Sequence, residues 1–400
     1  MIKKISVTNF KSIKQKVTLD LEASPDRSLK SNFFSTEKIL KSAVIYGHNA
    51  SGKSNFLEAI DFFIHLIITS HKNNEGDKIR NRNFYKLDDE YSKKSSEFEI
   101  EFELNSMNFV YFFSCDDKEI SEEKLTKNNK VLFHRKEKSL VEVNNYDKNK
   151  LNNYFDSTLD NMLLLSRAVN LKEDKILKEI YLFMRNISVI TQSNMFLEDF
   201  DSEITAEFIY NNPHSKNEVI ELLEACDLEI VDIKVVERDE EEYEKYPSKI
   251  KRLLSSPLEV KFIHRKSSSD ELIEFDLDEE SQGTKRFFSM IGLILSNIEN
   301  NKVLFIDELE KNLHPMLMEY LVKLFNSDKN KKSQFIFTTH NTELLNLNLL
   351  RRDQINFMQK NPDESTFLNS LYDFKVRKDL DIKKAYFSGR FGGIPIIIED

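Results

Sequence analysis

The stretch Gly47-His48-Asn49-Ala50-Ser51-Gly52-Lys53-Ser54 has the spacing of a phosphate-binding loop. An apolar run from Ala43 to Tyr46 precedes it, and an apolar-periodic segment from Asn55 to Ile68 follows, so strand, loop and helix come in the required order. The two glycines let the backbone curl, which turns its N–H groups and the positive helix end toward phosphate oxygens. The predicted nucleotide-binding residues here are Gly47, Asn49, Ser51, Gly52, Lys53, Ser54 and Asn55. Lys53 is expected to reach the β- and γ-phosphates, and the Ser54 hydroxyl to ligate Mg²⁺.

The composition predicts a soluble globular chain. Hydrophobic residues make up 40% of the 400 residues and charged residues 32%, which provides a large core and a solvated surface. The longest apolar run, Ile60 to Ile68, is interrupted by Asp61 and His65, and the N-terminus has no apolar leader. We therefore expect no membrane span and no secretion. The two cysteines, Cys115 and Cys226, indicate neither a disulfide framework nor a zinc site, so we expect a cytoplasmic protein.

The net charge indicates which kinds of binding partner are expected. A formal net charge of −10 argues against general nucleic-acid coating, although DNA binding by a local basic face stays open. The lysine-rich patch from Lys329 to Lys332 is interpreted as a solvated turn.

The periodicity of the chain changes twice. Apolar and polar residues alternate in residues 2–7, 17–21 and 97–104. Two further segments, residues 109–114 and 131–135, come after the last of these. All five are predicted to form antiparallel strands with one solvent-exposed face. Residues 70–94 are polar without periodicity and predict an exposed or mobile excursion. From Leu151 the apolar spacing becomes helical, with another helix from Lys216 to Ala225, and no heptad repeat is sustained. Residues 258–264 and 272–277 predict a late hairpin.

Two later apolar runs end in polar residues that fit nucleotide hydrolysis. Val303 to Ile306 is followed by Asp307-Glu308, where Asp307 would hold the Mg²⁺ shell and Glu308 would deprotonate the attacking water. Gln334 to Thr339 is followed by His340, whose imidazole could contact the γ-phosphate. Ligands bind at the carboxyl ends of strands in α/β sheets, so the predicted catalytic residues are Glu308, His340 and Lys53, and the predicted metal ligands are Ser54 and Asp307.

A third motif, Glu280-Ser281-Gln282-Gly283-Thr284, precedes an apolar-faced helix. Ser281 can cap that helix, and Gly283 allows a phosphate to approach its positive end. A simple capped helix is the alternative interpretation.

The order of these motifs, together with Leu313-His314-Pro315, resembles the ABC-type ATPase heads of the RecF, SMC and OLD-like group, and more narrowly the RloA-like ATPases of abortive-infection and restriction-linked defence operons. The resemblance covers about residues 1–70 and 258–400. It implies an α/β fold: a P-loop ATPase head with an antiparallel β lobe and a compact, mainly helical insertion. The expected segments are 1–136 (phosphate loop and β lobe), 137–257 (insertion) and 258–400 (signature, acidic pair and His340).

The resemblance also implies ATP and Mg²⁺ as cofactors and a homodimer or higher homo-oligomer. Ser281 and Gly283 would contact the γ-phosphate of ATP held by a second protomer, so that two heads enclose two nucleotides. Glu280 and Gln282 depart from the usual Leu-Ser-Gly-Gly signature. Gln192 is a candidate for the glutamine-loop residue. The tail from Tyr386 to Pro395 looks like that of the defence group and has no assigned role.

Two functions remain open at this point. The first is an ATPase that senses an invader and regulates an effector, possibly a nuclease, on a separate chain, because no nuclease-like segment follows the motifs before Asp400. The second is a RecF-like DNA-repair or DNA-clamp ATPase, which would bind DNA in a salt-sensitive way. A transporter ATPase is disfavoured because no membrane-coupling loop is recognisable, and a GTPase because no Asn-Lys-x-Asp stretch is present.

Overall fold

The computed structural model describes residues 1–144, 146–171, 174–191, 200–224, 230–237, 258–311, 313, 315–374 and 380–392. Packing divides the chain into two units. The larger unit contains Met1–Thr191, Lys302–Glu308 and Val322–Asp400, and the smaller unit contains Gln192–Asn301 and Leu309–Leu321. This division differs from the three segments 1–136, 137–257 and 258–400, which stay a prediction.

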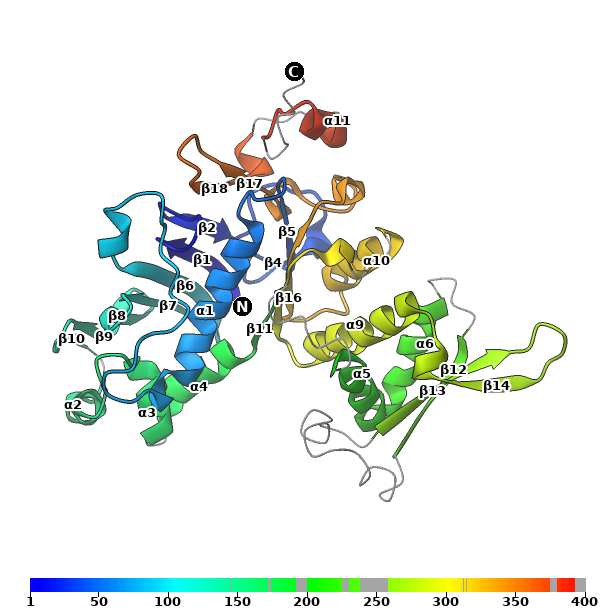
Figure 1. Ribbon diagram of the computed structural model, residues 1–400, viewed down its shortest axis with the longest axis horizontal. Helices are drawn as coiled ribbons and strands as arrows, with labels where there is room; N and C mark the ends of the chain where they lie inside the picture. Colours follow the sequence, from blue (N-terminus) through cyan, green and yellow to red (C-terminus); the bar gives the residue numbers. More distant parts are fainter. Residues whose placement is uncertain are drawn as a thin grey trace. The chain divides into compact units, whose positions relative to one another are not determined.

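The larger unit contains a six-stranded sheet in which five neighbouring strands are parallel (Figure 1). The strand order is β11 (Ile187–Ile190), β15 (Val303–Ile306), β16 (Gln334–Thr339), β5 (Ser42–Tyr46), β17 (Ile355–Lys360) and β18 (Thr366–Ser370), the last antiparallel to its neighbour. Strands β5, β15 and β16 are buried at every position, as their unbroken apolar runs predict. Because they are parallel, the residues that follow them meet at one sheet edge.

A seven-stranded antiparallel sheet forms the second layer of this unit. Its order is β10 (Ser139–Val143), β9 (Lys130–Lys136), β8 (Ile120–Lys127), β7 (Met107–Cys115), β6 (Ser96–Leu104), β1 (Ile2–Thr8) and β2 (Val17–Asp20). Helix α1 (Lys53–Thr69) packs on it, and Phe63 stacks on Phe98 and Phe113 at centroid distances of 5.9 and 5.3 Å. The antiparallel β lobe predicted from alternation is thus present. Helix α1 lies between the two sheets, and all three contribute to one hydrophobic core (Figure 1).

Further helices of this unit lie among its described residues. They are α2 (Lys148–Asp156), α3 (Leu164–Leu171), α4 (Lys175–Arg185) and α11 (Ile382–Phe387). The first three agree with the helical spacing that begins at Leu151. At the other end of the chain, Phe357 of β17 stacks on Tyr386 and Phe391 at 5.6 and 5.3 Å, so the described part of the tail packs against the parallel sheet. Residues 393–395 of the tail motif lie outside the described residues.

The segment 70–94 agrees in part with the sequence prediction of an exposed or mobile excursion. Most of its residues are exposed, but Ile79, Arg82, Tyr85 and Tyr91 are buried. Its second half is held by Asn9, whose amide donates to the carbonyls of Tyr91 and Lys94 and accepts from the Tyr85 N–H at 3.0 Å. A single distant asparagine supplies these bonds, and no local period reveals it.

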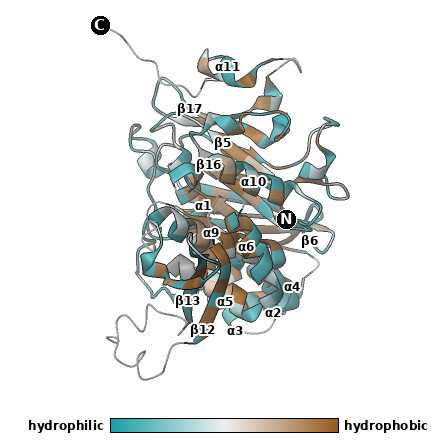
Figure 2. Cartoon of the chain, turned by 90° about the vertical axis from the view of Figure 1, so that its right-hand side faces the viewer, coloured by the Kyte–Doolittle hydropathy of each residue, from teal (hydrophilic) through white to brown (hydrophobic). Residues whose placement is uncertain are grey.

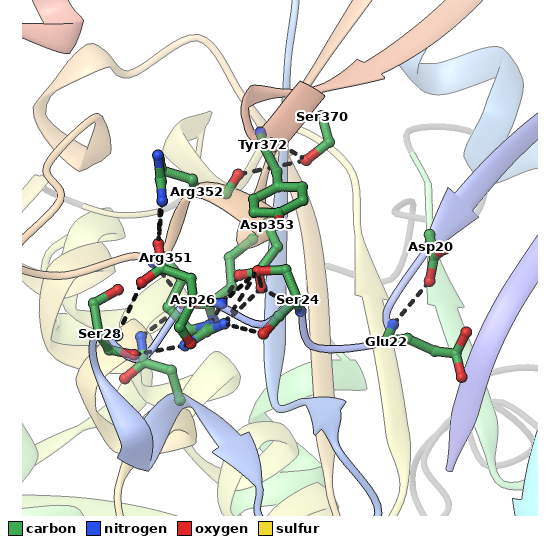
Figure 3. Close-up of polar contacts among 12 residues, drawn as sticks. Asp20, Glu22, Ser24, Asp26, Ser28, Arg351, Arg352, Asp353, Ser370 and Tyr372 are labelled. Carbon is green, nitrogen blue, oxygen red and sulfur yellow. Dashed lines mark hydrogen bonds and ion pairs between the residues drawn. The ribbon is translucent and has the colours of Figure 1, made fainter. Parts of the chain in front are cut away.

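A buried arginine anchors the entrance to β17 (Figure 3). Arg351 is 1% exposed and makes a two-pronged ion pair with Asp353, with bonds of 2.9 and 2.7 Å. It also donates to the carbonyls of Ser24 and Asp26, so the loop after β2 is tied to the strand. Burial raises the pKa of Asp26, but hydrogen bonds from Ser28 and Arg352 outweigh this effect and lower the pKa to about 2.

The smaller unit has a three-stranded antiparallel sheet with helices. Its elements are α5 (Phe200–Asn211), α6 (Lys216–Glu224), β12 (Ile230–Glu237), β13 (Leu258–Arg265), β14 (Leu272–Asp276) and α9 (Gln282–Glu299), and the hydrophobic residues of β12 and β13 appear brown in Figure 2. At Gly292 of α9 an added Cβ would lie 2.3 Å from the Thr205 Cα, so glycine allows α5 to pack closely. Helix α10 (Pro315–Asn326) crosses the boundary between units along the chain. Nowhere in the described ranges is a helix long and apolar enough to span a membrane.

One buried carboxylate joins the antiparallel sheet to helix α3. Glu123 of β8 is fully buried and accepts from the Leu164 and Leu165 N–H groups at 2.7 and 3.0 Å, which lie at the start of α3. It also accepts from the Tyr111 hydroxyl at 2.8 Å and lies 3.6 Å from the Arg135 guanidinium. Burial, and then the Glu123 charge, raise the pKa of Tyr111 well above its usual value.

We expect Glu123→Ala to lower the free energy of unfolding by about 3–5 kcal/mol, because Arg135 and two helix N–H groups would lose their partner in the core. Urea denaturation of the full chain measures the loss. The matched control is Glu122→Ala on the same strand, whose partly exposed pair with His134 predicts a loss of about 1 kcal/mol or less. Equal losses in the two variants would contradict the helix-anchoring role.

Candidate nucleotide site

The phosphate loop is folded around positions that have no room for a side chain. A Cβ at Gly47 would lie 2.5 Å from the Met358 carbonyl oxygen of β17, and one at Gly52 would lie 2.2 Å from the Thr366 hydroxyl of β18. Gly52 also has a φ of 107°, which an L-residue rarely adopts, and it forms the cap of α1. Both glycines of the motif are therefore required by the fold as well as by the predicted ligand.

A hydrogen-bonded chain holds this loop from outside. The Thr366 hydroxyl donates to the Ser51 carbonyl at 3.0 Å and lies 2.8 Å from the Ser12 hydroxyl. Ser12 in turn accepts from the Asn55 amide at 2.7 Å, in the first turn of α1. The turn after β1 and the start of β18 thus hold the second half of the loop, with Asn49 exposed at its tip and Ser54 half-buried.

Lys53 lies at the centre of the site and is 4% exposed. Its ammonium donates to the Gly47 carbonyl at 2.7 Å and the His48 carbonyl at 3.3 Å, and it lies 3.0 Å from Nε2 of His340. Because an ammonium can only donate, Nε2 is the acceptor in this contact. The two predicted residues, 287 positions apart in sequence, are in direct contact.

The acidic pair follows β15, with its backbone held by the neighbouring strand. Asp307 is 1% exposed, and its Oδ1 accepts a 2.6 Å bond from the Thr338 hydroxyl of β16. The same hydroxyl accepts from the Glu308 N–H at 2.7 Å. Glu308 has a φ of 49°, a left-handed conformation that costs an L-residue about 1–2 kcal/mol. One threonine therefore contacts both the Asp307 carboxylate and the Glu308 backbone.

The strand order explains how these groups meet. β16 lies between the strand of the phosphate loop and the strand of the acidic pair. Thr338 lies near the end of β16, and His340 is the first residue after it. Thr338 contacts the acidic pair on one side and His340 contacts Lys53 on the other.

The donor set fits a Mg²⁺ ion bound together with a nucleotide. The Oδ2 atom of Asp307 and the Oγ atom of Ser51 are buried and make no hydrogen bond within the part of the chain that the structure describes. Mg²⁺ usually takes one or two protein oxygens and completes its shell with phosphate oxygens and water. No cluster of three or more His, Cys, Asp or Glu among the described residues could hold a metal alone, which such a site does not require.

The signature motif lies in the smaller unit. Ser281 is the cap of α9, and its hydroxyl accepts from the Thr284 N–H at 3.1 Å, as predicted. Glu280 is bound to His264 of β13 at 2.5 Å, which fixes the approach to the helix. Gly283 is exposed, and an added Cβ would have only the Ser281 hydroxyl nearby, at 3.7 Å. Packing within this unit therefore does not require glycine at position 283.

Sequence reasoning missed three supporting residues, Thr338, Thr366 and Ser12. Thr338 lies inside an apolar run and had one available signal, because a hydroxyl in a strand buried at every position needs a partner. Thr366 and Ser12 have no local pattern that points to the loop. Gln192 and His314 lie outside the described residues.

Comparison with solved structures finds similar chains at low identity. An Smc head bound to the winged-helix domain of ScpA is 14% identical, covering 92% of this chain and 97% of that chain, with a TM-score of 0.45. The SMC head domain from Thermotoga maritima is 15% identical over 94% and 99%, with a TM-score of 0.44. The Smc head from Pyrococcus furiosus, with an extended coiled coil and the C-terminal domain of ScpA, is 15% identical over 97% and 98%, with a TM-score of 0.45. No curated protein matches the chain.

A family model also matches this chain. The model of the family described as "AAA domain, putative AbiEii toxin, Type IV TA system" matches residues 42–346. This range is more than half of the chain and includes the phosphate loop, the acidic pair, the α9 motif and His340. The α/β fold of a P-loop ATPase head with an antiparallel β lobe agrees with this match, and the chain belongs to this AAA-domain family.

Proposed function

We propose that this protein is a Mg²⁺-dependent ATPase that pairs head to head around ATP and regulates a separate effector. The observation that carries the proposal is that Lys53, His340, Asp307 and Glu308 all follow neighbouring parallel strands at one edge of the sheet, with Thr338 near the end of the strand between the two motifs and His340 directly after it. The phosphate loop binds the triphosphate, and bound Mg²⁺ supplies charge neutralisation between the β- and γ-phosphates.

Each residue of the site has its own role in the proposed binding and hydrolysis of ATP. Lys53 exchanges the Gly47 and His48 carbonyls for phosphate oxygens, and the Ser54 hydroxyl and Asp307 carboxylate hold the metal shell. Glu308 accepts the proton of the attacking water. His340, whose Nε2 faces Lys53, responds to the γ-phosphate when that phosphate arrives between them.

Pairing of two heads is supported by the position of Gly283. Glycine lowers the stability of a helix by about 0.5–1 kcal/mol relative to alanine, and none of the described residues of the smaller unit would crowd an added Cβ here. Ser281 and Gly283 are both exposed at the N-terminus of α9, a site that favours anions. We infer that this surface receives the γ-phosphate of ATP held by a second copy.

Regulation of a partner in anti-phage defence is supported by the family description, which names a toxin of a type IV toxin–antitoxin system. The nucleotide cycle is proposed to control whether an effector on another chain is bound or released. A RecF-like DNA clamp would instead show salt-sensitive DNA binding that follows the same ATP cycle.

Glu308→Gln is expected to retain ATP binding and to slow hydrolysis by about 10²- to 10⁴-fold, because the amide keeps the shape of the side chain but cannot take the proton. Calorimetry and phosphate release measure the two quantities, with Lys53→Ala as the variant that loses binding. With ATP present, Glu308→Gln should hold a co-expressed operon partner in one state, bound or released. Equal recovery of that partner with wild type, Glu308→Gln and Lys53→Ala would contradict nucleotide control.

Gly283→Arg should bind ATP normally and fail to dimerise in its presence, because the added bulk and charge occupy the face that meets the partner head. Light scattering in the Glu308→Gln background measures the mass. Gly283→Ala is the matched control, since an added Cβ has room and should leave the fold intact. If Gly283→Arg still formed a dimer in ATP and hydrolysed ATP at the wild-type rate, the proposed head-to-head pairing would be contradicted.

Thr338→Val should lower kcat by about 10- to 100-fold with little change in the KM for ATP, because it removes the hydroxyl that orients Asp307 and Glu308 and keeps the shape. The Mg²⁺ concentration for half-maximal activity should rise as well. Thr338→Ser keeps the hydroxyl and should restore both values. If serine were as damaging as valine, the effect would come from packing and not from the hydrogen bonds.

A further inference from the structure

Helix α11, coloured red in Figure 1, packs on the strands that place the phosphate loop. Tyr386 of this helix is 7% exposed, and its ring centroid lies 6.0 Å from that of Tyr46 and 5.6 Å from that of Phe357. Tyr46 is the last residue of β5 and is fully buried, and Gly47 follows it directly. The residue that precedes the phosphate loop is therefore in contact with the tail of the chain.

The path of the tail after α11 is fixed by its contacts with β17. Gly392 has a φ of 68°, and an added Cβ there would overlap the side-chain amide of Gln359. That amide donates to the Phe391 carbonyl at 2.6 Å, and the Phe391 ring stacks on the Phe357 ring at 5.3 Å. The described part of the tail is thus held on the parallel sheet on both sides of its turn.

A second contact of α11 reaches the segment that follows His340. The Lys383 ammonium is paired with the Glu343 carboxylate, in the short 3-10 helix Thr342–Leu344. Asn341 caps that helix by accepting from the Glu343 N–H at 2.9 Å, and it directly follows His340. The ion pair therefore attaches α11 to the chain close behind the imidazole.

The two contacts of α11 lie on the two sides of the Lys53–His340 contact. Thr339 and Tyr46 are register partners in neighbouring parallel strands, so the chain leaves β16 and β5 at the same level of the sheet. One strand continues into the phosphate loop and Lys53, and the other into His340. Nζ of Lys53 and Nε2 of His340 are 3.0 Å apart, and such a bond weakens steeply when either group moves or turns. A helix that contacts both segments can hold the two groups at this separation.

We propose that α11 is a positioning element that sets the separation of the phosphate loop and His340, with Tyr386 and Lys383 as its positioning residues. The inference rests on the proposed function, because it assigns the tail to the hydrolytic step of that same site. Tyr386 acts through packing in the core. Lys383 acts through an ion pair at the surface, in which the two side chains are 38% and 64% exposed. The surface pair is therefore the end of α11 that can be altered without changing the core.

Exchange of the charges across this ion pair tests the proposal. Lys383→Glu places two carboxylates together and should lower kcat for ATP about fivefold with little change in KM, because an exposed pair contributes at most about that factor. Adding Glu343→Lys restores the pair with its charges exchanged and should return kcat to the wild-type value. The matched control is Lys384→Glu on the same helix, whose ammonium lies 3.6 Å from the helix-capping Asp381, and kcat should not change.

The imidazole of His340 gives a readout that does not depend on turnover. Its proton NMR signal in the nucleotide-free chain, assigned by its loss in His340→Gln, should move in Lys383→Glu and return in the double variant. Lys384→Glu should leave the signal in place.

A tail that only covers the sheet would leave both the His340 signal and kcat of Lys383→Glu at their wild-type values, which would overturn the proposal. A double variant as slow as Lys383→Glu would overturn it as well. A wild-type chain that hydrolyses no ATP would overturn the proposed function, whereas the His340 signal would still decide whether α11 positions the imidazole.

Discussion

The phosphate loop depends on two places where atoms of neighbouring strands lie so close that no side chain fits. Gly47 lies against the Met358 carbonyl and Gly52 against the Thr366 hydroxyl, so the curl of the loop is fixed by β17 and β18. Those two strands are held in turn by the Arg351 network and by stacking of Phe357 on the tail. The loop is consequently preorganised by the folded sheet. Binding a phosphate then requires exchange of hydrogen bonds at Lys53 and little rearrangement of the backbone.

The parts of the fold that the sequence could predict are those whose signal is local. Unbroken apolar runs indicated β5, β15 and β16, alternation indicated β1 and β6, and Ser281 before an apolar face indicated the start of α9. The motif residues Lys53 and His340 are in contact, as expected of groups that follow neighbouring parallel strands. The strands, the loop and the helix start could be predicted because glycine spacing and strand ends are constraints on a few consecutive residues.

What could not be predicted depends on contacts between residues far apart in the chain. The segment 70–94 is held by Asn9, the phosphate loop by Thr366, and helix α3 by Glu123 of a strand that the pattern did not indicate. In each case one side chain satisfies backbone groups of a distant segment, so neither segment shows the pairing by itself.

Strand β16 gives the site a physical route from ligand to chemistry. Thr338 and His340 are two residues apart, one bonded to Asp307 and Glu308 and the other in contact with Lys53. A phosphate that displaced Lys53 from His340 would change the environment of one end of this short strand segment, whose other end orients the acidic pair. Such coupling requires the two arrangements of Lys53 to differ in their interaction with His340. Under the proposed function, loss of the contact between Lys53 and Nε2 of His340 would be the differential contact that this coupling requires.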